Sequence, residues 1–344
     1  MKKTIASLGH IATSAGDIPL VNSFLSPSDI IGSVMARMTI NRMNYRVGPG
    51  MYAIGNPTFD SPVFVTANYK LTFDTLRSQL KGISAWIMTL DTKGVNVWCA
   101  AAKGTFGTNE MVHRIRETGL AKIVSHRTLI VPQLGAPGIA ALEVRRDAGF
   151  SVRYGPVRAS DIPHYLKTGM RATPKMRLVD FSFIDRIVLI PAEIASIIRY
   201  GVLAAIGVFL LSGFGRAGFS PASMYSDGTT AALNITLSFF AGAVVTPLLL
   251  PWLPGRSFSM KGLVSGIAIF LLAVMIGMER SGIFGTVAWM LMMPAIASFL
   301  AMQFTGASTY TSLSGVKHEM RLALPLQIAF IVIGFLFLIV ARFT

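Results

Sequence analysis

The chain has a single cysteine, Cys99, and its neighbours could give its thiol a chemical role. It lies in the segment NVWCAAAK, residues 96–103, and a stretch rich in glycine and threonine follows directly. One thiol cannot form a disulfide within the chain, and a zinc or iron–sulfur site made by protein alone needs several Cys or His ligands. Cys99 is therefore a small buried apolar side chain, a nucleophile or a single metal ligand.

A short helix over residues 98–103 would place Asn96, Cys99 and Lys103 on one face, because they are three and four positions apart. A nearby ammonium group favours the thiolate form of a cysteine. A nucleophilic cysteine usually has a histidine base, and none of the five histidines carries a sequence signature for that role. The chemistry that remains is a thiolate that completes the coordination of a metal already held by a large cofactor.

The residues around Cys99 alternate between expected strands and helices. Strands are expected at 62–69, 85–90, 122–131 and 151–154, and helices at 72–81, 98–103, 110–118 and from Gly138 to about Asp147. This alternation predicts a Rossmann-like α/β domain with a mostly parallel sheet that binds ligands at the carboxyl ends of its strands. The Cys99 segment and the turn Gly135–Gly138 both follow strands, so we expect them at that edge.

The second half of the chain is much more apolar than the first. Mean hydropathy is +0.58, and residues 1–186 have a net charge of +11 whereas residues 187–344 have +4. Five apolar segments are near 188–212, 231–253, 262–278, 282–303 and 323–341, and a helix of about 20 apolar residues can cross a membrane. The expected organisation is an N-terminal arm (1–50), an α/β domain (51–170), a basic linker (171–186) and an all-α domain of five transmembrane helices (187–344).

Positive charge indicates the orientation in the membrane. Loops with Arg256 and Lys261 and with Lys317 and Arg321 are the more positive ones, which places the N-terminal domain in the cytoplasm, below the inner membrane. Residues 4–19 lack the continuous apolar core of a cleaved signal peptide. The basic residues are scattered and form no nucleic-acid motif, so lipid is the expected partner and nucleic acid is not.

The segment NVWCAAAKGTFGT resembles the cap-helix motif of the HgcA family, the corrinoid proteins of microbial mercury methylation. That motif is Asn-(Val/Ile)-Trp-Cys-Ala-(Ala/Gly)-Gly-Lys, and seven of its eight positions match. Ala102 stands where the family has glycine. The resemblance extends over nearly the whole chain: the soluble part resembles the corrinoid-binding domain of the corrinoid iron–sulfur protein of the acetyl-CoA pathway, and the five-helix tail resembles the membrane domain of mercury methylators.

The resemblance implies a corrinoid-dependent methyltransferase in which Cys99 binds cobalt from the lower axial side of cobalamin or a related corrinoid. Methyl carried on that cobalt would pass to inorganic Hg(II) and give methylmercury, since a thiolate donor increases electron density on the methyl group, as it does in haem proteins. The implied partners are a ferredoxin-like iron–sulfur protein of the HgcB type, which reduces cobalt and handles mercury, and a methyl-folate-dependent methyltransferase.

Other residues near Cys99 are candidates for cofactor binding. The full candidate set is Thr66, Asn96, Val97, Trp98, Cys99, Ala100, Lys103, Thr105, Gly135, Ala136, Pro137 and Gly138. Simpler roles compete: ordinary packing for Trp98, an Asx turn at Asn96, a solvated Lys103 and a plain tight turn at 135–138.

Two other functions fit the sequence. One is a corrinoid methyl carrier of one-carbon metabolism with another acceptor, which would not need a thiolate ligand. The other is a five-helix transporter with a cytoplasmic sensory domain, which would bind no cobalt and would use charged residues inside the membrane.

Overall fold

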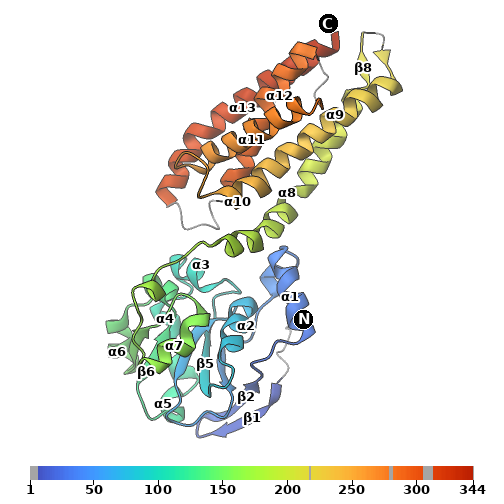
Figure 1. Cartoon of the computed structure of the whole chain (residues 1–344). Coiled ribbons are helices and arrows are strands. Elements are labelled where there is room, and N and C mark those ends of the chain that lie inside the picture. The colour runs from blue at the N-terminus through green and yellow to red at the C-terminus, as the bar shows by residue number, and fades with distance from the viewer. Residues whose placement is uncertain (1–6, 217, 279–281, 305–312, 344) are drawn as a thin grey trace. The chain divides into compact units, whose positions relative to one another are not determined.

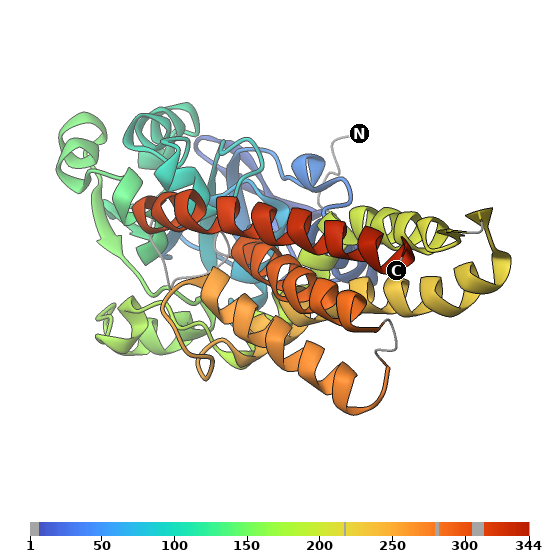
Figure 2. The same cartoon turned by 90° about the horizontal axis from the view of Figure 1, so that it is seen from above.

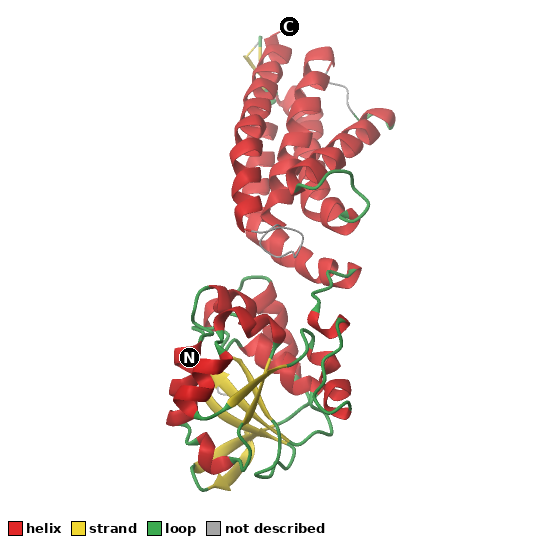
Figure 3. Ribbon diagram, turned by 90° about the vertical axis from the view of Figure 1, so that its left-hand side faces the viewer, coloured by secondary structure: helices red, strands yellow, loops and turns green. Residues whose placement is uncertain are grey.

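The computed structural model describes residues 7–216, 218–278, 282–304 and 313–343. The chain divides into two compact units, Met1–Val179 (unit 1) and Asp180–Thr344 (unit 2). Figure 3 shows that the main sheet belongs to unit 1 and that unit 2 is almost entirely helical.

Unit 1 is built on a seven-stranded mixed sheet with the strand order β1-β2-β3-β5-β4-β6-β7. The strands are β1 (Ser7–Thr13), β2 (Gly16–Val21), β3 (Gly50–Ile54), β4 (Val63–Ala67), β5 (Ala85–Leu90), β6 (Thr128–Val131) and β7 (Ser151–Tyr154). Strands β5, β4, β6 and β7 run parallel to one another, β2 is parallel to β3, and the pairs β1–β2 and β3–β5 are antiparallel. The predicted α/β fold is therefore confirmed.

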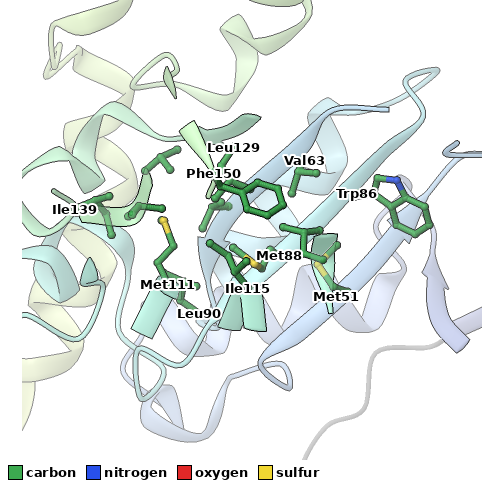
Figure 4. Packing of buried hydrophobic residues seen from close by; sticks show 14 of the residues in the cluster. Met51, Val63, Trp86, Met88, Leu90, Met111, Ile115, Leu129, Ile139 and Phe150 are labelled. Atoms are coloured by element: carbon green, nitrogen blue, oxygen red, sulfur yellow. The ribbon is translucent and has the colours of Figure 1, made fainter. Parts of the chain in front are cut away.

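Helices cover both faces of this sheet (Figure 1) because successive side chains of each strand point to opposite faces. Val63 and Val65 of β4 belong to one buried cluster and Phe64 to the other. Figure 4 shows the first cluster, in which Met111 and Ile115 lie against Met88 and Leu129 of the sheet. The helices of this face are α3 (Val97–Ala102), α4 (Thr108–Glu117), α5 (Leu120–Ile123) and α6 (Ala141–Ala148), and those of the other face are α2 (Lys70–Gln79) and α7 (Ile162–Lys167).

Five further elements belong to the described part of unit 1. They are α1 (Pro27–Arg37) and the 3₁₀ turns η1 (Arg42–Asn44), η2 (Gln133–Gly138), η3 (Ala159–Asp161) and η4 (Lys175–Arg177).

The structure differs from the sequence analysis in two segments of unit 1. The predicted strand 122–131 is extended only at β6, because Gly119 adopts a left-handed conformation (φ 58°) and starts the short helix α5. Residues 1–50, predicted as an arm, supply β1, β2 and α1. Buried Ile18 and Val21 join β2 to the core, which explains why this segment belongs to the sheet.

Among its described residues, unit 2 contains five helices that are long and apolar enough to cross a membrane, which confirms the predicted set. The spans are α8 (Phe183–Leu211), α9 (Pro221–Phe240) continued through the π-helical turn η5 (Ala241–Val245) into α10 (Thr246–Leu249), α11 (Phe258–Met275), α12 (Gly282–Gln303) and α13 (Leu313–Phe343). The hairpin β8 (Phe214–Gly215) and β9 (Gly218–Phe219) follows α8.

Three of the four cations used to orient the chain lie in helices rather than in loops. Lys261 belongs to α11, where its ammonium group donates to the carbonyl oxygen of Leu250 at 2.5 Å, and Lys317 and Arg321 belong to α13. The cytoplasmic placement of unit 1 therefore remains a prediction.

Small residues bring the helices of unit 2 close together. A Cβ on Gly262 of α11 would lie 2.6 Å from the carbonyl oxygen of Ala297 in α12, and one on Gly266 would lie 2.5 Å from the Cα of Pro294. On its other side α12 packs against α13 (Figure 2). Close approach of helix backbones through small residues is typical of membrane proteins.

Candidate functional site

The helix that carries Cys99, α3, follows β5 after a turn that is held to the neighbouring strand. Asn68 comes directly after β4 and is buried. Its side-chain oxygen accepts hydrogen bonds from the backbone N–H groups of Thr92 and Gly94, at 3.1 and 3.0 Å, and from the Thr92 hydroxyl at 2.9 Å. Its amide nitrogen donates to Asp91 at 3.0 Å. One buried side chain thus fixes the turn that leads into α3.

Asn96 is the N-cap of α3. Its backbone is extended, and its side-chain oxygen accepts a hydrogen bond of 2.9 Å from the backbone N–H of Cys99. Asparagine is among the preferred residues at this position because its side chain satisfies an N–H group that the helix leaves unpaired. The helix ends after Lys103 at Gly104, which has the left-handed φ of +78° that glycine tolerates best.

The two faces of α3 differ sharply. Val97, Ala100 and Ala101 are buried against unit 1. The opposite face carries Trp98, Cys99, Ala102 and Lys103, all of them exposed. Trp98 has 40% of its surface exposed, so the thiol lies on an accessible face beside an open indole ring. The alanine that replaces the family's glycine, Ala102, lies on this same face.

The inner face of α3 rests on Phe106 and on η2. Phe106 is fully buried, and its backbone N–H donates to the carbonyl oxygen of Ala100 at 3.1 Å. A Cβ on Gly135 would lie 2.5 Å from the Phe106 ring, whereas one on Gly138 would clash with the Phe106 carbonyl oxygen and lie 3.1 Å from the Cα of Ala101. These glycines therefore allow η2 to approach α3 closely.

The polar groups beneath α3 are paired. Glu110 of α4 accepts from the backbone N–H of Asp91 at 2.8 Å and binds Arg114 at 2.6 Å. Burial by itself raises the pKa of Asp91, but hydrogen bonds from Lys93 and Asn68 outweigh burial and hold this pKa below its usual value. Acidic charge is thus engaged below the helix, and the outward face of α3 carries only the positive Lys103.

The predicted site residues fall into two groups. Residues 96–105 and Gly135–Gly138 come together through the packing of α3 on η2, with Ala136 half-buried and Pro137 exposed. Thr105 is half-buried, and its backbone N–H donates to the carbonyl oxygen of Ala100 at 3.0 Å. Thr66 is apart from the outward face of α3, because it is buried in β4 opposite Thr89 of β5.

Sequence reasoning missed two residues that position this site. Phe106 supports α3 from below, and Thr92 closes the preceding turn by donating to the carbonyl oxygen of Val95 at 2.6 Å. A threonine two residues after a buried strand and just before Gly94 is a turn signal that could have identified Thr92. A phenylalanine between glycines, as in Gly104–Gly107, carries no comparable signal.

The outward face of α3 offers one soft donor atom, the sulfur of Cys99. Among the residues that the structure describes, no group of three or more His, Cys, Asp or Glu side chains is placed to hold a metal ion. A metal bound at Cys99 would therefore take its remaining ligands from a group other than these side chains. An exposed sulfur on a face that also carries Trp98, Ala102 and Lys103 suits such a preassembled metal group.

Comparisons with known proteins place unit 1 near one set of enzymes. Residues 28–166 match the family model described as CO dehydrogenase/acetyl-CoA synthase delta subunit. The acetyl-CoA decarbonylase/synthase complex subunit gamma of Archaeoglobus fulgidus is 36% identical over 128 residues, which are 37% of this chain and 27% of the relative. That of Methanosarcina acetivorans is 33% identical over 159 residues, 44% of this chain and 33% of the relative. The chain thus spans about a third or less of the length of these relatives.

Proposed function

We propose that this chain is a membrane-anchored, corrinoid-dependent methyltransferase whose methyl acceptor is inorganic Hg(II). The observation that carries the proposal is the exposed thiol of Cys99 on the outward face of α3. This helix contains the segment that resembles the HgcA cap-helix motif, and it follows the carboxyl end of β5. The similarity of unit 1 to subunits of acetyl-CoA-forming complexes supports a methyl-handling role.

The residues of this face fit a corrinoid. Cys99 offers a soft donor to the cobalt, and Trp98 offers a broad apolar surface that could lie against the ring. Lys103 supplies a positive charge four residues after the thiol on the same exposed face. The exposed part of η2, at Ala136 and Pro137, would border the ring, while Gly135 and Gly138 hold η2 against α3.

The protein's contribution to the reaction is position and electron donation. The bound corrinoid would supply the transferable methyl group. Cys99 would donate electron density through the metal, which favours release of methyl to a soft electrophile such as Hg(II). Asn96 and Asn68 hold the thiol in place through the cap of α3 and the turn before it. The proposal covers release of methyl with both bonding electrons and release as a radical.

The proposed partners are those that the resemblance to the HgcA family implies. A ferredoxin-like iron–sulfur protein of the HgcB type would supply electrons and deliver mercury, and a methyl-folate-dependent methyltransferase would supply the methyl group. The five spans of unit 2 would hold the protein in the inner membrane with unit 1 in the cytoplasm.

The test is a comparison of the full chain with Cys99→Ala, each loaded with cobalamin in detergent. We expect the wild type to show cobalt–sulfur scattering in X-ray absorption and a shifted visible spectrum, and we expect Cys99→Ala to lose both along with methylmercury formation. The matched control is Cys99→Ala combined with Thr75→Cys, which restores one exposed thiol on α2 and should restore neither signal. Identical spectra for wild type and Cys99→Ala would contradict the ligand assignment, and failure of both to bind cobalamin would favour the transporter alternative.

A second candidate, a methyl carrier with another acceptor, is favoured by the matches to acetyl-CoA decarbonylase/synthase subunits. It differs in its dependence on the thiol. With methyl-loaded protein offered Hg(II) or a second corrinoid protein as acceptor, a carrier would transfer methyl to the corrinoid acceptor even as Cys99→Ala. The proposed methyltransferase would transfer to Hg(II), and only with Cys99 present.

A further inference from the structure

Helix α1 of unit 1 turns its large apolar side chains outward and its small and acidic side chains toward the protein. The side that faces the protein carries Asp29 and the small residues Gly32 and Ala36, of which the last two are buried. The outward side carries large apolar residues, among them Ile31 with 60% of its surface exposed. A surface helix of a globular domain normally has the opposite arrangement, with its apolar stripe against the core.

A buried ionic network fixes this orientation. Asp29 accepts from Lys70 at 2.5 Å and from Arg77 at 2.8 Å, and Asp74 binds the same two cations at 2.6 and 2.7 Å. Arg77 also donates to the backbone carbonyl oxygen of Asn22 at 2.5 Å. Rotating α1 to bury its apolar side would leave Lys70 and Arg77 with Asp74 as their one carboxylate partner, so one buried positive charge would be uncompensated, which is strongly unfavourable.

The space beneath α1 also excludes a rotated helix. A Cβ on Gly32 would lie 2.7 Å from the ring of Tyr45. The hydroxyl of Tyr45 donates to the carbonyl oxygen of Asp29 at 3.1 Å. Only a side without bulky residues fits there, so the large apolar residues must point outward.

These outward residues form one apolar face that extends beyond the helix into η1 (Figure 1 shows both elements). Its members are exposed and come from a short stretch of chain. The face consists of Phe24, Ile30, Ile31, Val34, Met35, Met38, Ile40 and Met43. Contiguous exposed apolar surface of this kind marks an interaction site.

The charges around the apolar face are positive. Arg37 is half-buried, Arg42 and Arg46 are exposed, and the ammonium group of Lys81 lies 4.8 Å from the centre of the Phe24 ring. The one acidic residue between positions 24 and 46 is Asp29, which faces inward to Lys70 and Arg77. The surroundings are therefore complementary to a negatively charged surface.

We infer that the apolar face of α1 and η1 docks on the anionic lipid surface of the membrane. A helix with bulky apolar residues on one side and flanking arginines can lie at the level of the lipid headgroups. The same chain supplies five possible membrane spans, the first of which begins at Phe183. These spans would hold unit 1 close to the membrane. Lipid would then be present at a high effective concentration that a soluble protein partner lacks.

Docking of this face would also bring the thiol site to the membrane surface. The turn η1 lies at the same edge of the sheet as the Cys99 segment: a Cβ on Gly94 would lie 3.0 Å from the carbonyl oxygen of Met43. In addition, the backbone N–H of Val47 donates to the carbonyl oxygen of Asn68 at 2.9 Å. A docked unit 1 would expose its catalytic edge to solutes concentrated at the headgroups.

The experiment uses the full chain in nanodiscs and a label on α1. With Cys99→Ser as a cysteine-free background, Met35→Cys places a polarity-sensitive fluorophore on the outward face, and Thr75→Cys places it on the exposed side of α2 as the control. The discs contain phosphatidylcholine alone or with phosphatidylglycerol, plus nitroxide-labelled lipid as the quencher. We expect quenching and a blue shift at Met35→Cys only, and more strongly with phosphatidylglycerol.

Charge reversal gives the quantitative part of the test. Arg42→Glu exchanges one attraction for a repulsion, and each unit of charge at an anionic surface changes the docked-to-free ratio by about fivefold, so this variant should lower the ratio by about 25-fold. Lys122→Glu, on the opposite side of the sheet from α2, is the matched charge control and should leave quenching unchanged.

Three results would overturn the inference. One is the absence of lipid quenching at Met35→Cys in both kinds of disc. Another is equal quenching with and without phosphatidylglycerol. The third is a blue shift at Met35→Cys in the discs that is not accompanied by quenching from the nitroxide-labelled lipid, which would mean that protein covers the face. None of these measurements depends on corrinoid binding, so the inference can fail or hold independently of the proposed methyl transfer.

Discussion

Helices α1 and α3 of unit 1 both present exposed functional candidates, but they are held by opposite chemistry. The inner face of α3 is apolar, with Val97, Ala100 and Ala101 packed onto Phe106 and η2. The inner face of α1 is ionic, with Asp29 bound to two buried cations. Packing of small apolar groups is insensitive to pH, whereas a buried carboxylate is not. The difference shows that the contacts on the inner side of a helix decide which residues it exposes. The exposed side can therefore be given a role only after those contacts are known.

The largest effect is expected when the ionic anchor of α1 loses a cation. Arg77→Met leaves Asp29 and Asp74 with Lys70 as their one shared cation and should destabilise unit 1 by about 3–5 kcal/mol, as removing one member of a buried ionic network does. Hydrogen exchange of the full chain should show loss of protection in α1 and α2 first. The control Arg146→Met removes a pair on an exposed surface and should cause no measurable change. Equal protection in both variants would show that the network does not hold α1.

Acid should release α1 before α3. Burial alone would raise the pKa of Asp29, but hydrogen bonds from Lys70 and Ser26 and the charge of Lys70 hold it well below its ordinary value. The stabilisation is therefore complete above the unfolded-state pKa of about 3.9 and is lost as the pH falls below it. Hydrogen exchange across this range should show α1 opening first. Asp29→Asn should remove the pH dependence, and simultaneous opening of the two helices would contradict the comparison.

The packing anchor of α3 can be broken at Gly138. Gly138→Ala forces a methyl group against the Phe106 carbonyl oxygen and the Cα of Ala101, and overpacking of this kind costs about 1–3 kcal/mol. The expected result is lower thermal stability and faster hydrogen exchange in α3, with α1 unchanged. Gly48→Ala is the control, because its Cβ would make an ordinary contact of 3.4 Å with the Tyr52 hydroxyl.

The smallest expected effect is at the cap of α3. Asn96→Ala removes the acceptor for the Cys99 N–H and should cost about 1 kcal/mol. Asn96→Asp keeps a capping oxygen and should retain most of the stability. The readout is exchange of the Cys99 amide hydrogen, and equal rates in Asn96→Ala and Asn96→Asp would rule out the cap as the feature that orders this residue.

Local patterns were enough to predict strand β5 with the same bounds and a short helix at Cys99, over 98–103 against the observed Val97–Ala102. The role of Asn96 as the N-cap of this helix was not predicted. The five apolar segments could be predicted equally well, because a membrane span is recognised from the length and composition of one continuous segment.

The rest depends on partners far apart in the sequence. Asp29 and Lys70 are 41 positions apart, so the sequence does not show that α1 is anchored by its charged side, and residues 1–50 were therefore predicted as an arm. The role of Gly138 was also hidden, because Phe106 and Ala101 reach it only in the folded chain.

The close contact of α11 with α12 has a consequence for the transporter alternative. With Gly262 and Gly266 set against Ala297 and Pro294, the two backbones touch without intervening side chains. A permeation route along this seam would require the helices to part and to give up that contact over more than one turn. A solute crossing unit 2 would have to use a different seam.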